Sequence, residues 1–239
     1  MNLKTVKAII FDFDGVIADT VVDIADAVNK TLENFGFTTL PVATVLSFTG
    51  DGAVKLLQRA LEAADKIEQT SATFRDIYQW YVQYYESHCV AKTVLYPGME
   101  NLLELLNIKN IPVAIVSNKP WAVTDAIVKK LNIAHLFAAV IGPEQTAHVK
   151  PNPEGILLAI KTINEKLAEH HKAPLRLEEV LMVGDSATDI QAGKNAGIKT
   201  CAVTGGYGNK EKLRQATPDM ELVLASELMV PLGEPDNHE

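Results

Sequence analysis

Five short, continuous apolar runs stand out along the 239-residue chain. A run that is apolar at every position, rather than at every second position, is typical of a strand covered on both faces of a parallel sheet. The sequence therefore predicts buried strands in five places. They are residues 7–11, 112–116, 138–141, 180–183 and 200–203.

Stretches with apolar residues at helical spacing separate most of these runs. They cover residues 98–108, 121–132, 153–169 and 187–196. Alternation of strand and helix predicts an α/β fold with a doubly wound, parallel, Rossmann-like core.

The interval between the first and second apolar runs is different, because it contains no convincing strand. Its apolar positions fall at helical spacing over 21–35, 52–64 and 71–89. We therefore expect residues 19–90 to form a small all-helical cap inserted after the first strand. The sequence Tyr96-Pro97-Gly98 marks the return to the core, which residues 1–18 and 91–239 would form.

Composition and charge narrow the range of functions. The hydrophobic content of 47% is ordinary for a globular protein with a real core. The 22 basic and 30 acidic residues give a net charge of -8, which argues against binding to nucleic acid. An anionic substrate would therefore need positive charge gathered locally around its site.

The cysteines and the hydropathy of the sequence both bear on where in the cell the protein is expected to act. Cys89 and Cys201 lie far apart and form no disulfide framework, which favours a reducing cytoplasm. The N-terminal residues do not have the pattern of a signal peptide. No stretch approaches the roughly 20 apolar residues of a membrane span, so we expect no membrane partner.

Two acidic residues follow the first apolar run directly. Asp12 and Asp14 stand one residue apart, before Gly15. In a doubly wound sheet, ligands bind at the carboxyl ends of the strands. Two carboxylates held together there repel each other, so a hard divalent cation is the expected partner. An exposed acidic turn is the plainer alternative.

Residues that suit an anion follow later strands. The Ser117 hydroxyl can donate to a phosphate oxygen, and the amides from Asn118 onward open a helix whose N-terminus attracts anions. Lys150 is followed by two prolines that fix its loop, so its ammonium group is held in place. Taken singly, these residues also fit a helix cap and a solvated surface lysine.

The fourth apolar run leads to two further acids, Asp185 and Asp189. Asp185 would complete a metal site with the acids after the first strand. Asp189, four residues later, would hold either Lys150 or a metal-bound water. A helix N-terminus that favours acids through its dipole is the alternative explanation.

These segments occur in one fixed order along the chain: DFDG at 12–15, SN at 117–118, KP at 150–151 and GDSATD at 184–189. In this combination they resemble the haloacid dehalogenase superfamily of phosphotransferases, and the resemblance spans the whole chain. It implies an enzyme with the α/β core and small cap described above, acting on phosphate esters.

The resemblance also implies a role for each matching residue. Asp12 is the nucleophile, and Asp14 is the general acid and base. Mg²⁺ is held by the side chains of Asp12 and Asp185 and by the backbone carbonyl of Asp14. Asp189 supports the site from behind these ligands. The phosphate-binding residues are Ser117, Asn118 and Lys150.

The resemblance implies a two-step reaction. Asp12 attacks phosphorus to form an aspartyl phosphate, while Asp14 protonates the departing alkoxide and then deprotonates the attacking water. Mg²⁺ shields the nucleophile from the anionic phosphate. An acid at position 14 does not fit the dehalogenases or the phosphonate-cleaving members of the superfamily.

Segments 48–61, 96–98, 117–120, 140–142 and 205–208 look like the phosphoglycolate phosphatase branch of the superfamily. In the cap, Gly50 and Gly52 would let backbone amides approach a carboxylate at a helix start, and a plain helix-entry turn is the alternative. The candidate substrate contacts are Gly50, Asp51, Gly52 and Lys119. The segment 205–208 is otherwise interpreted as a turn after the last strand.

One position departs from this branch, because Val16 follows Gly15 where the branch usually has threonine. Gly-Val is frequent in sugar-phosphate mutases. The prediction is thus a Mg²⁺-dependent phosphatase of a small phosphorylated metabolite, 2-phosphoglycolate first, acting in the cytoplasm as a monomer or homodimer. A β-phosphoglucomutase-like transferase is the enzymatic alternative, and a non-catalytic phosphate-sensing module is the alternative from another class.

Overall fold

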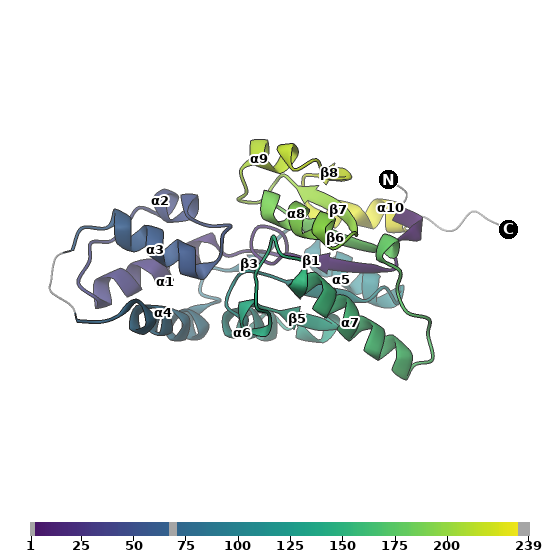
Figure 1. The fold of residues 1–239 in the computed structure, drawn as a ribbon, viewed down its shortest axis with the longest axis horizontal. Coiled ribbons are helices and arrows are strands. Elements are labelled where there is room, and N and C mark those ends of the chain that lie inside the picture. Colours follow the sequence, from purple (N-terminus) through teal and green to yellow (C-terminus); the bar gives the residue numbers. More distant parts are fainter. Residues whose placement is uncertain (1–2, 67–70, 234–239) are drawn as a thin grey trace.

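A computed structural model describes residues 3–66 and 71–233. Six parallel strands form one sheet in the order β5-β4-β1-β6-β7-β8 (Figure 1). The strands are β1 (Ala8–Phe11), β4 (Val113–Val116), β5 (Ala139–Ile141), β6 (Val180–Gly184), β7 (Lys199–Val203) and β8 (Met220–Leu222). Because β1 lies between β4 and β6, the residue after its carboxyl end, Asp12, lies near the middle of that edge of the sheet.

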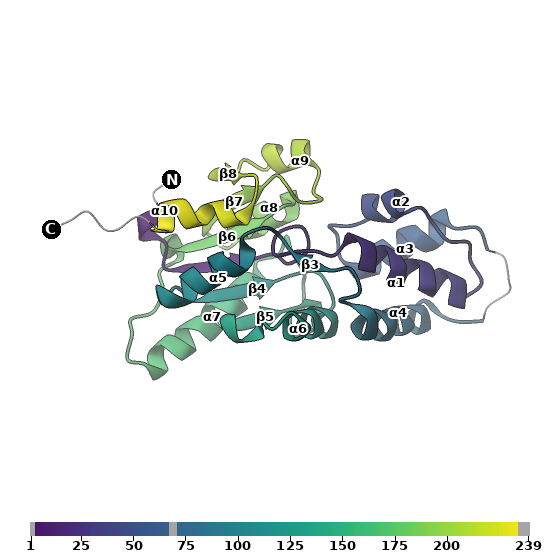
Figure 2. The ribbon, with the colours of Figure 1, turned by 180° about the vertical axis from the view of Figure 1, so that it is seen from behind.

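Helices cover both faces of this sheet. The helices α7 (Glu154–Glu169) and α8 (Ala187–Asn195) contact strands on one face. On the other face lie α5 (Met99–Ile108), α6 (Trp121–Lys130) and α10 (Met229–Gly233), as Figures 1 and 2 show from opposite sides. The strands β1 and β4 are apolar at every position, because neither face of the sheet meets water there.

The side chains of β1 illustrate this burial. Successive residues of a strand point to opposite faces, so Ile9 and Phe11 pack into the cluster that includes α5 and α6. Ala8 and Ile10 join the cluster that includes α7. All four are completely buried. Each large side chain buried in this way contributes about 1.5–3 kcal/mol to stability.

Four helices lie together beyond the carboxyl end of the sheet, on the left in Figure 1, and we call them the cap helices. They are α1 (Val21–Asn34), α2 (Val42–Ser47), α3 (Ala53–Ala63) and α4 (Phe74–His88). Their contact faces carry apolar residues at helical spacing: Leu32, Leu57 and Tyr85 are completely buried.

Two short strands connect the sheet to the cap helices. β2 (Ala18–Asp19) leads into the cap and β3 (Val94–Leu95) leads out of it, and the two pair antiparallel. The amide of Tyr96 also donates to the carbonyl of Ile17, 3.0 Å away. The two crossings therefore form one narrow, hydrogen-bonded connection.

The predicted fold class is confirmed: a parallel α/β core with a small helical cap after the first strand. Each predicted strand matches an observed one to within a residue at either end. The sequence did not predict β8, α2, the pair β2–β3 or the six-residue α9 (Lys210–Gln215). Residues 19–90 as a separate domain remain a prediction.

None of the helices within residues 3–66 and 71–233 combines the length and the apolar character needed to cross a membrane.

Candidate active site

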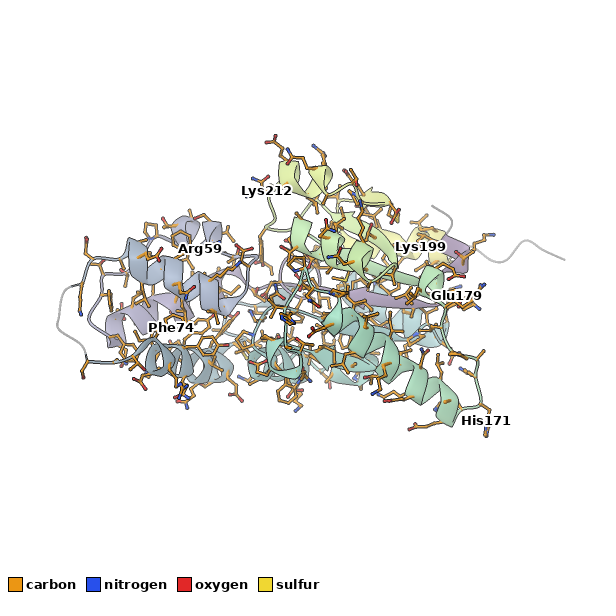
Figure 3. The ribbon with its side chains drawn as sticks, viewed as in Figure 1. Arg59, Phe74, His171, Glu179, Lys199 and Lys212 are labelled. Atoms are coloured by element: carbon orange, nitrogen blue, oxygen red, sulfur yellow. The ribbon has the colours of Figure 1, made fainter. Side chains whose placement is uncertain are left out.

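A cavity of about 540 Å³ lies between the cap helices and the carboxyl end of the sheet. Residues of the sheet and of the cap both line it. Arg59 reaches it from α3, and Lys212 reaches it from α9 on the core; Figure 3 labels both. From the predicted set, the cavity is lined by Asp12, Asp14, Gly50, Asp51, Gly52, Ser117, Asn118, Lys119, Lys150, Asp185 and Asp189.

The centre of the site is an ion-paired group of three residues from three distant segments. The ammonium of Lys150 lies 2.8 Å from Oδ1 of Asp12 and 2.6 Å from Oδ1 of Asp189. Burial alone would lower the pKa of Lys150, but the two carboxylates outweigh it and raise that pKa. The lysine is therefore a fixed cation beside Asp12. Asp189 thus contacts Lys150, one of the two partners predicted for it, and a metal-bound water as the other partner stays a prediction.

Asp185 is held from behind by backbone amides. Its Oδ2 accepts hydrogen bonds from the amides of Tyr207, at 2.6 Å, and Gly208, at 3.1 Å. Burial raises the pKa of Asp185, and the carboxylates of Asp189 and Asp12 raise it further. A buried carboxylate surrounded by acids in this way is stabilised by a cation.

The acidic residues of the site fit a divalent cation. One carboxylate oxygen each of Asp12, Asp185 and Asp189 lie within 4.8 Å of one another. An all-oxygen set suits a hard ion such as Mg²⁺. Within the described residues, no hydrogen bond reaches Oδ2 of Asp12 or Oδ1 of Asp185, whereas Asp189 is engaged by Lys150. The predicted ligands, Asp12 and Asp185, thus keep an oxygen available.

Ser117 and Asn118 differ in their surroundings. Both are buried at the end of β4, and both line the cavity. The Asn118 side chain donates to the carbonyl of Lys150 and accepts from its amide, each at 3.0 Å. It therefore fixes the backbone that carries the lysine. Its predicted contact with phosphate stays a prediction.

Asp14 lies apart from the other three carboxylates. The Thr20 hydroxyl donates to its Oδ1 at 2.6 Å, and the ammonium of Lys119 lies 3.0 Å from the same oxygen. Lys119 lines the cavity and lies against Asp14, and its predicted contact with substrate stays a prediction. Within the described residues, Asp14 and Asp12 thus have different cationic partners, Lys119 and Lys150.

The predicted cap contacts reach the cavity on a loop before α3. Gly50 and Gly52 both have positive φ, 100° and 90°, which favours glycine. A side chain at Gly52 would meet the backbone oxygen of Asn118 at 3.1 Å, so the cap loop closely approaches the core. Asp51 pairs with Arg59 in the structure.

Tyr207 is a structural component of the site that the sequence did not predict. Its amide donates to Asp185, and its hydroxyl accepts from the amide of Thr20 and donates to Asp19. It therefore joins Asp185 to the chain segment that enters the cap. The glycine-rich segment 205–208 was the available signal, but it was interpreted as a resemblance to the branch and as a turn, with no role for Tyr207.

A model of the haloacid dehalogenase-like hydrolase family matches residues 9–203. A phosphoglycolate phosphatase from Neisseria meningitidis is 33% identical over 213 residues, covering 89% of this chain and 86% of the relative. A phosphoglycolate phosphatase from Photorhabdus laumondii is 30% identical over 98% of this chain and 95% of the relative.

A solved structure gives the same picture. The crystal structure of a predicted phosphoglycolate phosphatase from Haemophilus somnus 129PT superimposes with a TM-score of 0.80 and 27% identity. The match covers 95% of this chain and 97% of that one. The predicted hydrolase class is therefore confirmed. The family model spans both the sheet and the cap, and on this ground the chain belongs to the haloacid dehalogenase-like hydrolase family.

Proposed function

We propose that this protein is a Mg²⁺-dependent phosphatase that hydrolyses a small phosphate monoester, with 2-phosphoglycolate as the first candidate. One observation carries the proposal: Asp12 directly follows the central strand β1, lies beside the fixed cation Lys150 and lines a cavity beneath the cap. The names of the relatives, phosphoglycolate phosphatases from two bacteria, support both the reaction and the substrate.

Asp12 is the nucleophile in this proposal. Its carboxylate attacks phosphorus, and the bond to the alkoxide leaving group breaks, giving an aspartyl phosphate. Ser117 donates to a phosphate oxygen. Lys150 balances the charge on Asp12 and on the incoming phosphate, since its ammonium lies 2.8 Å from the carboxylate.

Asp14 is the general acid and base in this proposal. In its protonated form it gives a proton to the departing alkoxide, and as a carboxylate it then takes one from the water that cleaves the aspartyl phosphate. Removing this acid would therefore slow both half-reactions.

Mg²⁺ would be held by the carboxylates of Asp12 and Asp185 and by the backbone carbonyl of Asp14, and it would supply positive charge to the phosphoryl group. The amides of Tyr207 and Gly208 hold Asp185 in the orientation that this role requires.

Residues 19–90 act as a cap domain in this proposal. The cap loop at Gly50–Gly52 lines the cavity together with the core, and cap closure would exclude water during phosphoryl transfer. The size of the cavity, about 540 Å³, favours a small metabolite over a phosphorylated protein.

Phosphate release from a panel of small esters, with Mg²⁺ present, tests the proposal. We expect turnover of 2-phosphoglycolate, and Asp12→Asn should lower kcat about a thousandfold or more with an unchanged circular dichroism spectrum. Full activity of Asp12→Asn would contradict the assignment of the nucleophile. Isomerisation of glucose phosphates without free phosphate would instead indicate the mutase.

A further inference from the structure

We propose that Lys119 is a positioning residue that links the carboxylate of Asp14 to cap helix α4 through Tyr85. The inference rests on the proposed function, in which Asp14 is the acid and base. It assigns to the cap a direct mechanical connection with the proton-transferring group, beyond the exclusion of water.

The contacts of the Lys119 ammonium define this link. The ammonium nitrogen lies 3.0 and 3.2 Å from the two carboxylate oxygens of Asp14 and 2.7 Å from the hydroxyl of Tyr85. It also lies 4.3 Å from the centre of the Tyr85 ring, within reach of a cation–π contact. One ammonium therefore contacts a core acid and a cap tyrosine at the same time.

Burial makes these contacts obligatory. The Lys119 side chain is 3% exposed, and Tyr85 is completely buried. A buried ammonium must be paired, and within the described residues Asp14 is the carboxylate with which it forms a salt bridge. Lys119 cannot turn to solvent without breaking that pair, so its position follows those of Asp14 and Tyr85.

The other oxygen contact of Asp14 also comes from the cap side of the chain. Thr20, the residue before α1, donates its hydroxyl to Asp14 at 2.6 Å. Its amide donates to the hydroxyl of Tyr207, also at 2.6 Å. Asp14 is thus held by the entry segment of the cap and, through Lys119, by the last cap helix.

The two buried lysines have different carboxylate partners. Lys150 pairs with Asp12 and Asp189 at the nucleophile, whereas Lys119 pairs with Asp14 and contacts the cap. A change in the tilt of α4 displaces Tyr85 and, with it, the ammonium that orients the Asp14 carboxylate. We therefore expect Lys119 to affect proton transfer more strongly than substrate binding.

Two variants test the link: Lys119→Met removes the charge, and Tyr85→Phe removes only the hydroxyl that joins Lys119 to the cap. With 2-phosphoglycolate, or with the best ester of the panel, we expect Lys119→Met to lower kcat about a hundredfold and change KM less than about threefold. Tyr85→Phe should lower kcat about fivefold. Tyr78→Phe, a hydroxyl removed from the same helix, is the matched control and should leave kcat unchanged.

p-Nitrophenyl phosphate supplies a second readout, because its leaving group departs without a proton. In Lys119→Met the first step should keep its rate while the water step slows, giving a burst of about one nitrophenolate per active site. A purely structural defect would lower the burst amplitude along with the steady-state rate, and that result would overturn the proposal.

Asp14→Asn in combination with Lys119→Met completes the test. If Lys119 acts through Asp14, the double variant should be no slower than Asp14→Asn alone. Additive losses together with a raised KM would assign Lys119 to substrate binding and overturn the link. Wild-type protein without any phosphatase activity would instead refute the proposed function, and wild-type activity with unaffected variants would refute only the link.

Discussion

At the scale of single residues, the most constrained group is the carboxylate of Asp185. The three glycines around it, Gly15, Gly206 and Gly208, leave no room for a side chain, because an added Cβ would overlap atoms of Asp185 in each case. Only Gly15 among them has a positive φ, at 79°. Close approach, more than backbone conformation, therefore explains the glycines of segment 205–208.

We expect Gly208→Ala to weaken Mg²⁺ binding, because the new methyl group would push the loop away from the Asp185 backbone. The Mg²⁺ concentration for half-maximal activity should rise about tenfold or more, as is typical when a residue behind a metal ligand is lost. A magnesium titration of phosphatase activity measures this. Gly197→Ala is the control, since the same substitution is made at a strained glycine, φ 74°, that does not line the cavity. Equal magnesium dependence in the two variants would contradict this role for the loop.

The sequence located the charged residues of the site but not the hydroxyls that orient them. Motif order was sufficient for Asp12, Lys150 and Asp185, because each follows a strand and strand ends meet at one edge. Thr20 and Tyr207 are 187 residues apart, and no local pattern reveals a hydrogen bond over that separation. A hydroxyl becomes informative only once the fold places its partner.

At the scale of elements, the length of a helix or strand decided whether the sequence could predict it. The strand β6 and the helix α7 were predicted because their apolar patterns continue over five and sixteen residues. The helix α2 has six residues, and β8 has three, none of them fully buried. Patterns this short do not distinguish a helix, an edge strand and a loop.

One buried acid lies just before the amino ends of two central strands, β1 and β6. Glu179, labelled in Figure 3, precedes β6; its side chain is 3% exposed and pairs with Arg176 at 2.9 Å and Lys7 at 2.8 Å. Hydrogen bonds from Arg176 and Lys7 lower the pKa of Glu179 from 4.5 to about 2. Lys7 stands just before β1, so the pair fastens neighbouring strands.

This depressed pKa predicts a pH-dependent contribution to stability. The ionised acid stabilises the fold fully above pH 4.5, and the contribution is lost as the pH falls toward about 2. Glu179→Gln should therefore be less stable than wild type at neutral pH, and the difference should shrink between pH 4.5 and 2. Denaturant unfolding across that range measures it. A difference that stays constant with pH would show that the charge is not responsible.

At the scale of the whole molecule, the cavity brings together charged residues of both signs from the cap and the core; its acids are Asp12, Asp14, Asp51, Asp185 and Asp189. The chain carries a net charge of -8, yet the cavity is lined by Arg59, Lys119, Lys150 and Lys212. The first three lie within salt-bridge distance of carboxylates. The sequence predicted basic residues at an anion site, and four line the cavity beside the acids. Their distribution between cap and core depended on how the two parts meet.

We expect Mg²⁺ to stabilise the folded protein, because it would neutralise the buried carboxylates of Asp12 and Asp185. At a concentration of one hundred times Kd, a ligand that binds only the folded state adds about 2.7 kcal/mol. Differential scanning calorimetry with and without Mg²⁺ measures the rise in Tm. Asp185→Asn should abolish the rise, and an equal rise in that variant would place the ion elsewhere.

The two ends of the described chain lie together, far from the cap. The segment η1 (Leu3–Thr5) contacts α10, and Figure 1 places both at the opposite end of the core from the cap helices. A stretching load applied between the ends would act on the junction of η1 and α10, and the inserted helices would bear none of it until the sheet itself gave way.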